Sequence, residues 1–126
     1  SNNIYTCVTL IRFNTMISRI IYDLFNVIPN YINSYNSRRF GFPELMQPRK
    51  FNKKGEKILK LNNPVLFGNY DYKCDKKHII FEKVADLEPQ IIWQRNKYGL
   101  IKKECYDQSD AYCAVLGFMK KNGFWK

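Results

Sequence analysis

The stretch that decides the predicted fold is RKFNKKGEKILKLNNPVLFGNYDYKCDKKHIIFEKVADLEPQIIWQRNKYGLIKK, residues 49–103. It begins with a basic leader and continues into short runs of β-branched and aromatic residues that turn-forming residues separate, a pattern typical of antiparallel strands. Tyr70, Tyr72 and Cys74 alternate with charged residues, which predicts one packed and one charged face. We therefore expect a three- to five-stranded, mostly antiparallel sheet over residues 56–103. The predicted runs are residues 58–61, 64–67, 70–74, 77–84, 90–94 and 98–102.

The N-terminal residues 1–36 are expected to be mainly helical. From Leu10 to Ile28 the apolar residues follow the i, i+3, i+4, i+7 spacing of an amphipathic helix. Charged side chains interrupt the apolar segment, so we do not expect it to span a membrane. We favour one helix throughout, which Pro29 ends or bends. The alternative is a strand over residues 4–12, followed by a shorter helix.

Residues 37–55 are predicted to form a loop and the basic leader. Two phenylalanines, Phe40 and Phe42, lie beside arginines and close to three glycine or proline residues. Exposed aromatic rings beside arginine can stack on nucleic-acid bases. Alternatively, these rings fold back together with Leu45 and Met46 and cap the core.

The C-terminal helix is predicted over residues 109–122. Ser109 is a suitable N-cap, Lys120 and Lys121 oppose the negative end of the helix dipole, and Gly123 supplies a left-handed cap. The expected fold is therefore a single α+β domain over residues 1–126, with a helical N-terminus and a C-terminal helix packed on the sheet.

The composition predicts a folded and strongly basic chain. Of its 126 residues, 45% are hydrophobic and 16% aromatic, which suffices for a core without metal or disulfide staples. The formal net charge is +10, and residues 49–60 alone hold six basic residues against one acidic residue. Such a balance points to a polyanionic partner: nucleic acid, an anionic membrane surface or an acidic protein.

Nucleic acid is the partner that we expect first. Lysine and arginine side chains neutralise phosphates and release counterions, and aromatic side chains stack on bases where they face outward. The aromatic candidates are Phe51, Tyr70, Tyr72, Trp93 and Tyr98. The predicted phosphate-binding residues are Arg49, Lys50, Lys53, Lys54, Lys57, Lys60, Lys76, Lys77, Arg95 and Lys97.

Two alternatives belong to other functional classes. One is a protein-interaction domain, such as an inhibitor, an immunity factor or a viral adaptor, that docks on an acidic protein partner. The other is a small metal-independent ribonuclease or toxin domain, in which His78 acts as general base. Its phosphorane-stabilising residue would be Lys76 or Lys77, and its second proton carrier Glu82 or Tyr72.

No cofactor or metal site is expected. The chain contains no common nucleotide-binding, zinc-protease or calcium-loop motif. The spacing of Cys74 and His78 with Cys105 and Cys113 matches no common structural-zinc pattern. Without a C-x-x-C motif or a disulfide framework, the four cysteines are expected to be thiols in a reducing intracellular compartment. The alternative is one or two disulfides in an exported protein.

Overall fold

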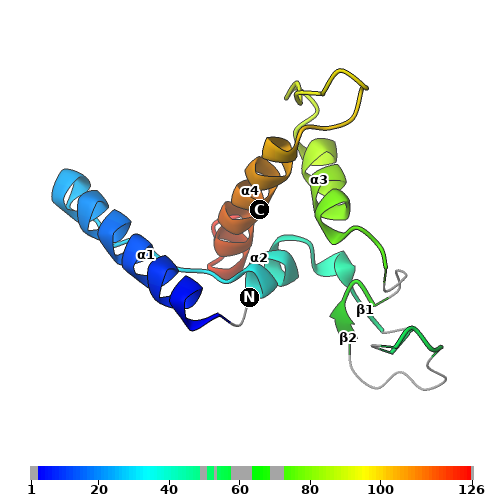
Figure 1. The fold of residues 1–126 in the computed structure, drawn as a ribbon, viewed down its shortest axis with the longest axis horizontal. Helices are drawn as coiled ribbons and strands as arrows, with labels where there is room; N and C mark the ends of the chain where they lie inside the picture. The colour runs from blue at the N-terminus through cyan, green and yellow to red at the C-terminus, as the bar shows by residue number, and fades with distance from the viewer. Residues whose placement is uncertain (1–2, 49–50, 53, 58–63, 69–72, 126) are drawn as a thin grey trace. The chain divides into compact units, whose positions relative to one another are not determined.

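The structure is a computed structural model that describes all residues except 1–2, 49–50, 53, 58–63, 69–72 and 126 (Figure 1). The chain forms two compact units, residues 1–31 and residues 32–126. The single-domain organisation of the whole chain stays a prediction.

Residues 1–31 are built on one helix, α1 (Ile4–Phe25). The side chain of Asn3 caps its first turn by accepting a hydrogen bond from the Tyr5 N–H at 2.8 Å. The helix ends where Asn26 takes a left-handed conformation, with φ of 53°. The prediction of one continuous helix is confirmed, but the helix ends at Asn26 and not at Pro29.

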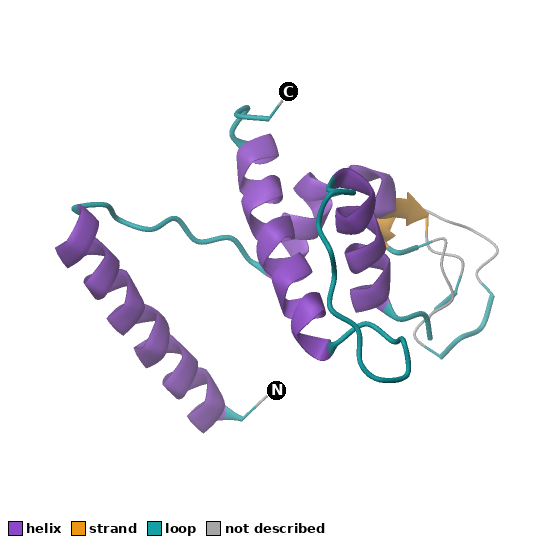
Figure 2. Cartoon of the chain, turned by 90° about the horizontal axis from the view of Figure 1, so that it is seen from above, coloured by secondary structure: helices purple, strands orange, loops and turns teal. Residues whose placement is uncertain are grey.

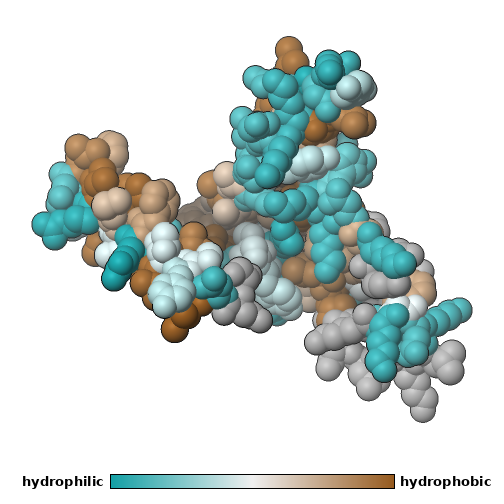
Figure 3. All heavy atoms as spheres, in the orientation of Figure 1, coloured by the Kyte–Doolittle hydropathy of each residue, from teal (hydrophilic) through white to brown (hydrophobic). Residues whose placement is uncertain are grey.

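α1 is unusual because none of its residues is buried, although most of them are apolar. Leu24, for example, is 70% exposed, and Figure 3 shows apolar residues along much of this helix. Within the described residues 3–31, a hydrogen bond between the hydroxyls of Ser18 and Tyr31 holds the segment after α1 against the helix. No described helix of the chain is long and apolar enough to cross a membrane.

Residues 32–126 contain three α-helices, a short 3₁₀ helix and a two-stranded sheet in the part that the structure describes (Figure 1). β1 and β2 are antiparallel, with Met46 opposite Leu66 and Pro48 opposite Pro64. Figure 2 shows the sheet beside the helices. The elements are α2 (Ser34–Gly41), η1 (Pro43–Leu45), β1 (Met46–Pro48), β2 (Pro64–Leu66), α3 (Lys76–Leu87) and α4 (Lys103–Lys121).

The predicted α+β fold with a three- to five-stranded sheet is therefore wrong. Most of the described residues lie in helices, and these residues form only one pair of strands. The run at residues 77–84 lies in α3, where Asp75 caps the first turn by accepting a hydrogen bond from the His78 N–H at 3.2 Å. Ile80 and Val84, one helical turn apart, are both buried. Helical burial therefore overrides the β propensity of these residues.

The other predicted runs have mixed outcomes. The run at residues 64–67 contains β2, and residues 90–94 form no strand. Residues 98–102 contribute only Ile101, which forms an isolated bridge with Arg95. Residues 58–61 and most of residues 70–74 lie outside the described part of the chain.

The predicted N-terminus of the last helix is also wrong. α4 begins at Lys103, and Ser109 lies buried inside it, where its hydroxyl donates to the Tyr106 carbonyl at 2.9 Å. The predicted C-terminal end is confirmed, with lysines in the last turn and Gly123 at φ of 75°. Residues 37–48, the first part of the predicted loop, instead contain most of α2 together with η1 and β1.

The core lies where α2, η1, β2, α3 and α4 meet. Phe42 and Leu45 belong to it, which favours the core-capping interpretation for these two residues. Phe40 is half-buried and lies under the cations of Arg39 and Lys121, at 5.5 and 5.7 Å from its ring centroid. The buried cluster consists of Phe42, Leu45, Phe67, Ile80, Val84, Cys113 and Leu116.

α2 packs against α4 at a very short backbone separation. A Cβ atom added to Gly117 would lie 2.5 Å from the Ser37 carbonyl oxygen and 2.7 Å from the Ser37 Cα. One turn earlier, the Cys113 thiol donates to the same carbonyl at 3.6 Å, and burial raises the pKa of that thiol to about 11. Lys120 Nζ donates to the Gly41 carbonyl at 2.8 Å. Only glycine at position 117 permits this approach.

This contact predicts that Gly117→Ala destabilises the protein. In a helix, glycine to alanine normally stabilises by up to ~1 kcal/mol, but here the new methyl group meets backbone. Overpacking of this kind costs about 1–3 kcal/mol. Chemical denaturation measures the free energy of unfolding. Gly41→Ala is the control, because its Cβ would lie 3.4 Å from Cys113 Sγ, an ordinary contact, and stability should stay near wild type. A Gly117→Ala protein as stable as wild type would contradict the contact.

Candidate nucleic-acid interface

The basic leader contains a tight turn that we call the first hairpin turn, residues 51–57, of which residue 53 is not described. Phe51 and Lys57 form an isolated antiparallel bridge. Asn52 N–H donates to the Glu56 carbonyl at 2.9 Å, and Gly55 N–H donates to the Asn52 carbonyl at 3.0 Å. Gly55 has φ of 84°, the left-handed conformation that three-residue hairpin loops require.

The Asn52 side chain stabilises this turn through hydrogen bonds to other residues of the turn. Its Oδ1 accepts hydrogen bonds from the backbone N–H groups of Lys54 and Glu56, each at 2.9 Å. Its Nδ2 donates to Glu56 Oε2 at 2.7 Å. One asparagine therefore satisfies two backbone donors, a common use of asparagine in turns. The side chains of Lys54 and Lys57 are left exposed.

A second hairpin turn, residues 95–101, has the same geometry. Asn96 N–H donates to the Leu100 carbonyl at 2.8 Å, and Gly99 N–H donates to the Asn96 carbonyl at 3.0 Å. Asn96 Oδ1 accepts from the N–H groups of Tyr98 and Leu100, at 2.9 and 3.1 Å. Gly99 has φ of 78°.

The two turns are copies of one sequence pattern, Asn-Lys-x-Gly. Residues 52–55 read Asn-Lys-Lys-Gly and residues 96–99 read Asn-Lys-Tyr-Gly. Every backbone and Oδ1 hydrogen bond of the first turn therefore has its counterpart in the second, and Lys54 corresponds to Tyr98. The repetition is readable in the sequence, but we did not use it in predicting the site.

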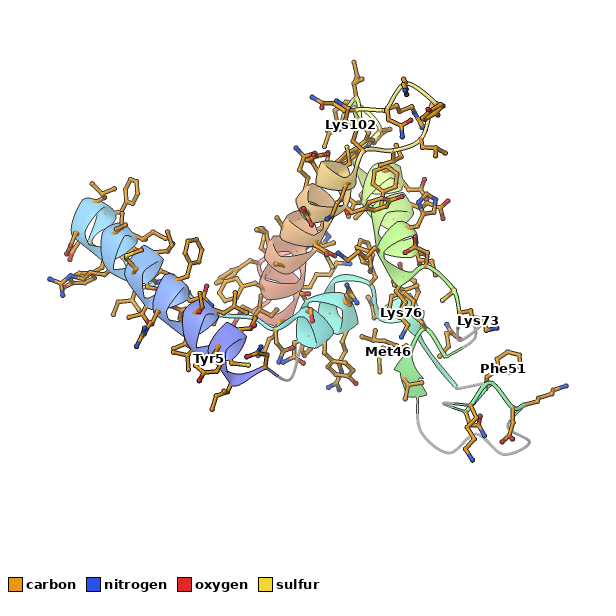
Figure 4. All side chains as sticks on the ribbon, in the orientation of Figure 1. Tyr5, Met46, Phe51, Lys73, Lys76 and Lys102 are labelled. Carbon is orange, nitrogen blue, oxygen red and sulfur yellow. The ribbon has the colours of Figure 1, made fainter. Side chains whose placement is uncertain are left out.

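The predicted phosphate-binding residues fall into three described groups. Lys54 and Lys57 lie on the first hairpin turn, Arg95 and Lys97 on the second, and Lys76 and Lys77 in the first turn of α3; all six are exposed. The second hairpin turn joins α3 to α4, so it lies at the end of α3 opposite Lys76 (Figures 1 and 4). Arg49, Lys50, Lys53 and Lys60 lie outside the described residues, as does Tyr72.

α4 also begins with lysines, which the sequence analysis did not assign to the site. Lys102 is its N-cap residue, Lys103 is its first residue, and no side chain caps this end. Figure 4 shows Lys102 beside the loop that carries the second hairpin turn. Four lysines thus lie at the N-terminal ends of α3 and α4, where the helix dipole attracts anions.

The lone histidine joins α3 to α4. His78 Nδ1 lies 3.0 Å from the Tyr106 hydroxyl, and His78 Nε2 lies 3.2 Å from Glu82 Oε1. A general base needs a ring nitrogen that faces the substrate, and here both nitrogens have protein partners. Glu82, one of the two residues predicted as second proton carrier, lies beside His78, but the contacts of both ring nitrogens favour a structural role in which the ring links α3 to α4. That hypothesis stays a prediction without added support.

The loop before α4 is fixed by contacts to α4. The Tyr112 hydroxyl donates to Glu88 Oε1 at 2.7 Å, and Lys102 N–H donates to the Gln94 carbonyl at 3.1 Å. Burial of the phenol, together with the hydrogen bond and charge of Glu88, raises the pKa of Tyr112 to about 12. Hydrogen bonds from Tyr112 and Gln90 lower the pKa of Glu88. The second hairpin turn therefore projects from an anchored loop.

The Tyr112 contact predicts a loss of stability at alkaline pH. A phenol whose pKa is higher in the folded than in the unfolded protein favours folding below its unfolded pKa, near 10, and loses that contribution as pH rises toward 12. Tyr112→Phe should therefore show a smaller stability loss between these pH values in urea unfolding. Tyr98→Phe removes a hydroxyl outside this contact and should keep the wild-type profile. Identical profiles for wild type and Tyr112→Phe would contradict the assignment.

The described histidine, cysteine, aspartate and glutamate residues form no group of three or more that could hold a metal ion, and Cys7, Cys105 and Cys113 are free thiols. Comparison of the chain with protein-family models, curated proteins and solved structures found no match. The functional assignment therefore depends on the geometry of the two hairpin turns and of the basic helix ends.

Proposed function

We propose that residues 32–126 bind nucleic acid through phosphate contacts. The observation that carries this proposal is the repeated hairpin turn: two Asn-Lys-x-Gly segments adopt the same hydrogen-bonded geometry and expose basic side chains. A turn that satisfies its own backbone does not need its lysines for folding. The basic side chains are therefore available for an anionic ligand.

The absence of ion pairs at these lysines, within the described residues, supports the proposal. Ion pairs within the described residues include Arg19–Asp23, Arg38–Asp110 and Lys83–Glu44, and His78 lies beside Glu82. None of them involves a lysine of the hairpin turns or of the first turns of α3 and α4. Within the described residues, no carboxylate therefore pairs directly with these lysines, although Glu56, Asp75 and Glu104 lie in the same segments. Their positive charge attracts phosphates over a distance that salt limits.

The positions of the helix-end lysines are also unfavourable for local stability. A cation in the first turn of a helix opposes the dipole, at a cost of about 0.3–1 kcal/mol. Lys76 and Lys77 in α3, and Lys103 in α4, occupy such positions. A bound phosphate would reverse the sign of this term, because it interacts favourably with both the dipole and the lysines.

Removing one lysine from each hairpin turn tests the proposal. Lys54→Gln/Lys97→Gln should lower affinity for DNA or RNA and make the plot of log affinity against log salt less steep by about 1.4–1.8, since each lost phosphate contact contributes about 0.7–0.9. Fluorescence anisotropy between about 50 and about 200 mM salt measures both quantities.

Arg12→Gln/Lys121→Gln is the matched control, because it removes the same charge from exposed positions outside the two turns. Its salt dependence should equal that of the wild type. Equal weakening in both double variants would show that net charge, and not the hairpin turns, governs binding. Absence of binding to any nucleic acid at low salt would contradict the proposal and favour the acidic-protein alternative.

A further inference from the structure

We infer that the nucleic acid is single-stranded and that Tyr98 stacks on one of its bases. This inference rests on the proposed function and adds the class of ligand. It is carried by the position of Tyr98 within the second hairpin turn, by its exposure and by the two cations of the same turn.

The turn itself does not require an aromatic residue at position 98. The corresponding residue of the first hairpin turn is Lys54, and the two turns share their backbone and Oδ1 hydrogen bonds. A lysine there satisfies the same geometry, so Tyr98 is not explained by folding of the turn. Its ring is not explained by packing either, because Tyr98 is 74% exposed.

A cation lies against the exposed ring, and a second cation lies on the same turn. Lys97 Nζ lies 4.9 Å from the ring centroid of Tyr98. On the same turn, Arg95 Nη1 donates to the Gly99 carbonyl at 2.9 Å, which holds the guanidinium beside the turn. An exposed aromatic ring on a turn that also carries two cations is the combination that sites for single strands use, since the cations track the backbone while the ring stacks on a base.

Single strands suit this arrangement better than duplexes. In a duplex the faces of the bases are covered by their neighbours, whereas in a single strand they are free to stack on a protein ring. The loop that carries this turn also has exposed apolar side chains, namely Ile92 at 94% and Leu100 at 64%. Trp93, by contrast, is half-buried and packs on Phe81, so it is not available to a base.

The test compares three ligands of about 12 nucleotides, within the usual size of such sites: a single strand of DNA, an abasic strand with the same number of phosphates, and the duplex. Tyr98→Ala should weaken binding of the base-bearing strand by about 5- to 150-fold, equivalent to one lost base stack. It should leave binding of the abasic strand unchanged. Tyr98→Phe retains the ring and should bind all three ligands as the wild type does.

A further variant, Tyr98→Lys, places at position 98 the residue type that the first hairpin turn has at the corresponding position, so the geometry of the turn should be retained. It should bind the abasic strand at least as tightly as wild type but lose the preference for the base-bearing strand. Equal binding of the three ligands, with no effect of Tyr98→Ala, would overturn the inference while leaving phosphate binding intact. Failure of the wild type to bind any ligand would instead overturn the proposed function.

Discussion

The fold of residues 32–126 depends on the short separation between α2 and α4 at Gly117. Because this glycine has no side chain, the helix backbones approach until the Ser37 carbonyl lies against it, and the Cys113 thiol and Lys120 ammonium supply hydrogen bonds to α2 carbonyls. This contact brings Phe42 and Leu45, which follow α2, into the core with α3 and α4. The loop from which the second hairpin turn projects joins α3 to α4. Packing at Gly117, which positions α4, therefore supports the candidate site.

Part of the fold was readable in the sequence. The spacing of apolar residues predicted α1, and Lys120, Lys121 and Gly123 predicted the end of α4. The sheet was not predicted correctly, because β-branched residues at 77–84 favour a strand locally, whereas Asp75 caps a helix there and the core buries one face of it. Local propensity did not decide this segment, since the contacts that bury Ile80 and Val84 come from elements distant in the sequence.

The candidate site was predicted residue by residue but not as an arrangement. Charge alone pointed to Lys54, Lys57, Arg95 and Lys97. It does not show that these residues lie on two hairpin turns with the same hydrogen-bond geometry. The Asn-Lys-x-Gly repetition was the missed signal, because asparagine and glycine at this spacing specify the turn through hydrogen bonds within five residues. The contact of His78 with Tyr106 had no such signal, since it joins residues on different helices.

The most direct measurement of the central claim is an NMR titration of the isotope-labelled protein with a single-stranded oligonucleotide. The amides of Gly55 and Gly99 report on the two hairpin turns separately. If the turns are two copies of one phosphate-binding element, both amide signals shift, they saturate at the same ligand concentration, and added salt reverses both shifts. Shifts confined to α1 or to the last turn of α4, with both glycine signals unmoved, would contradict the claim.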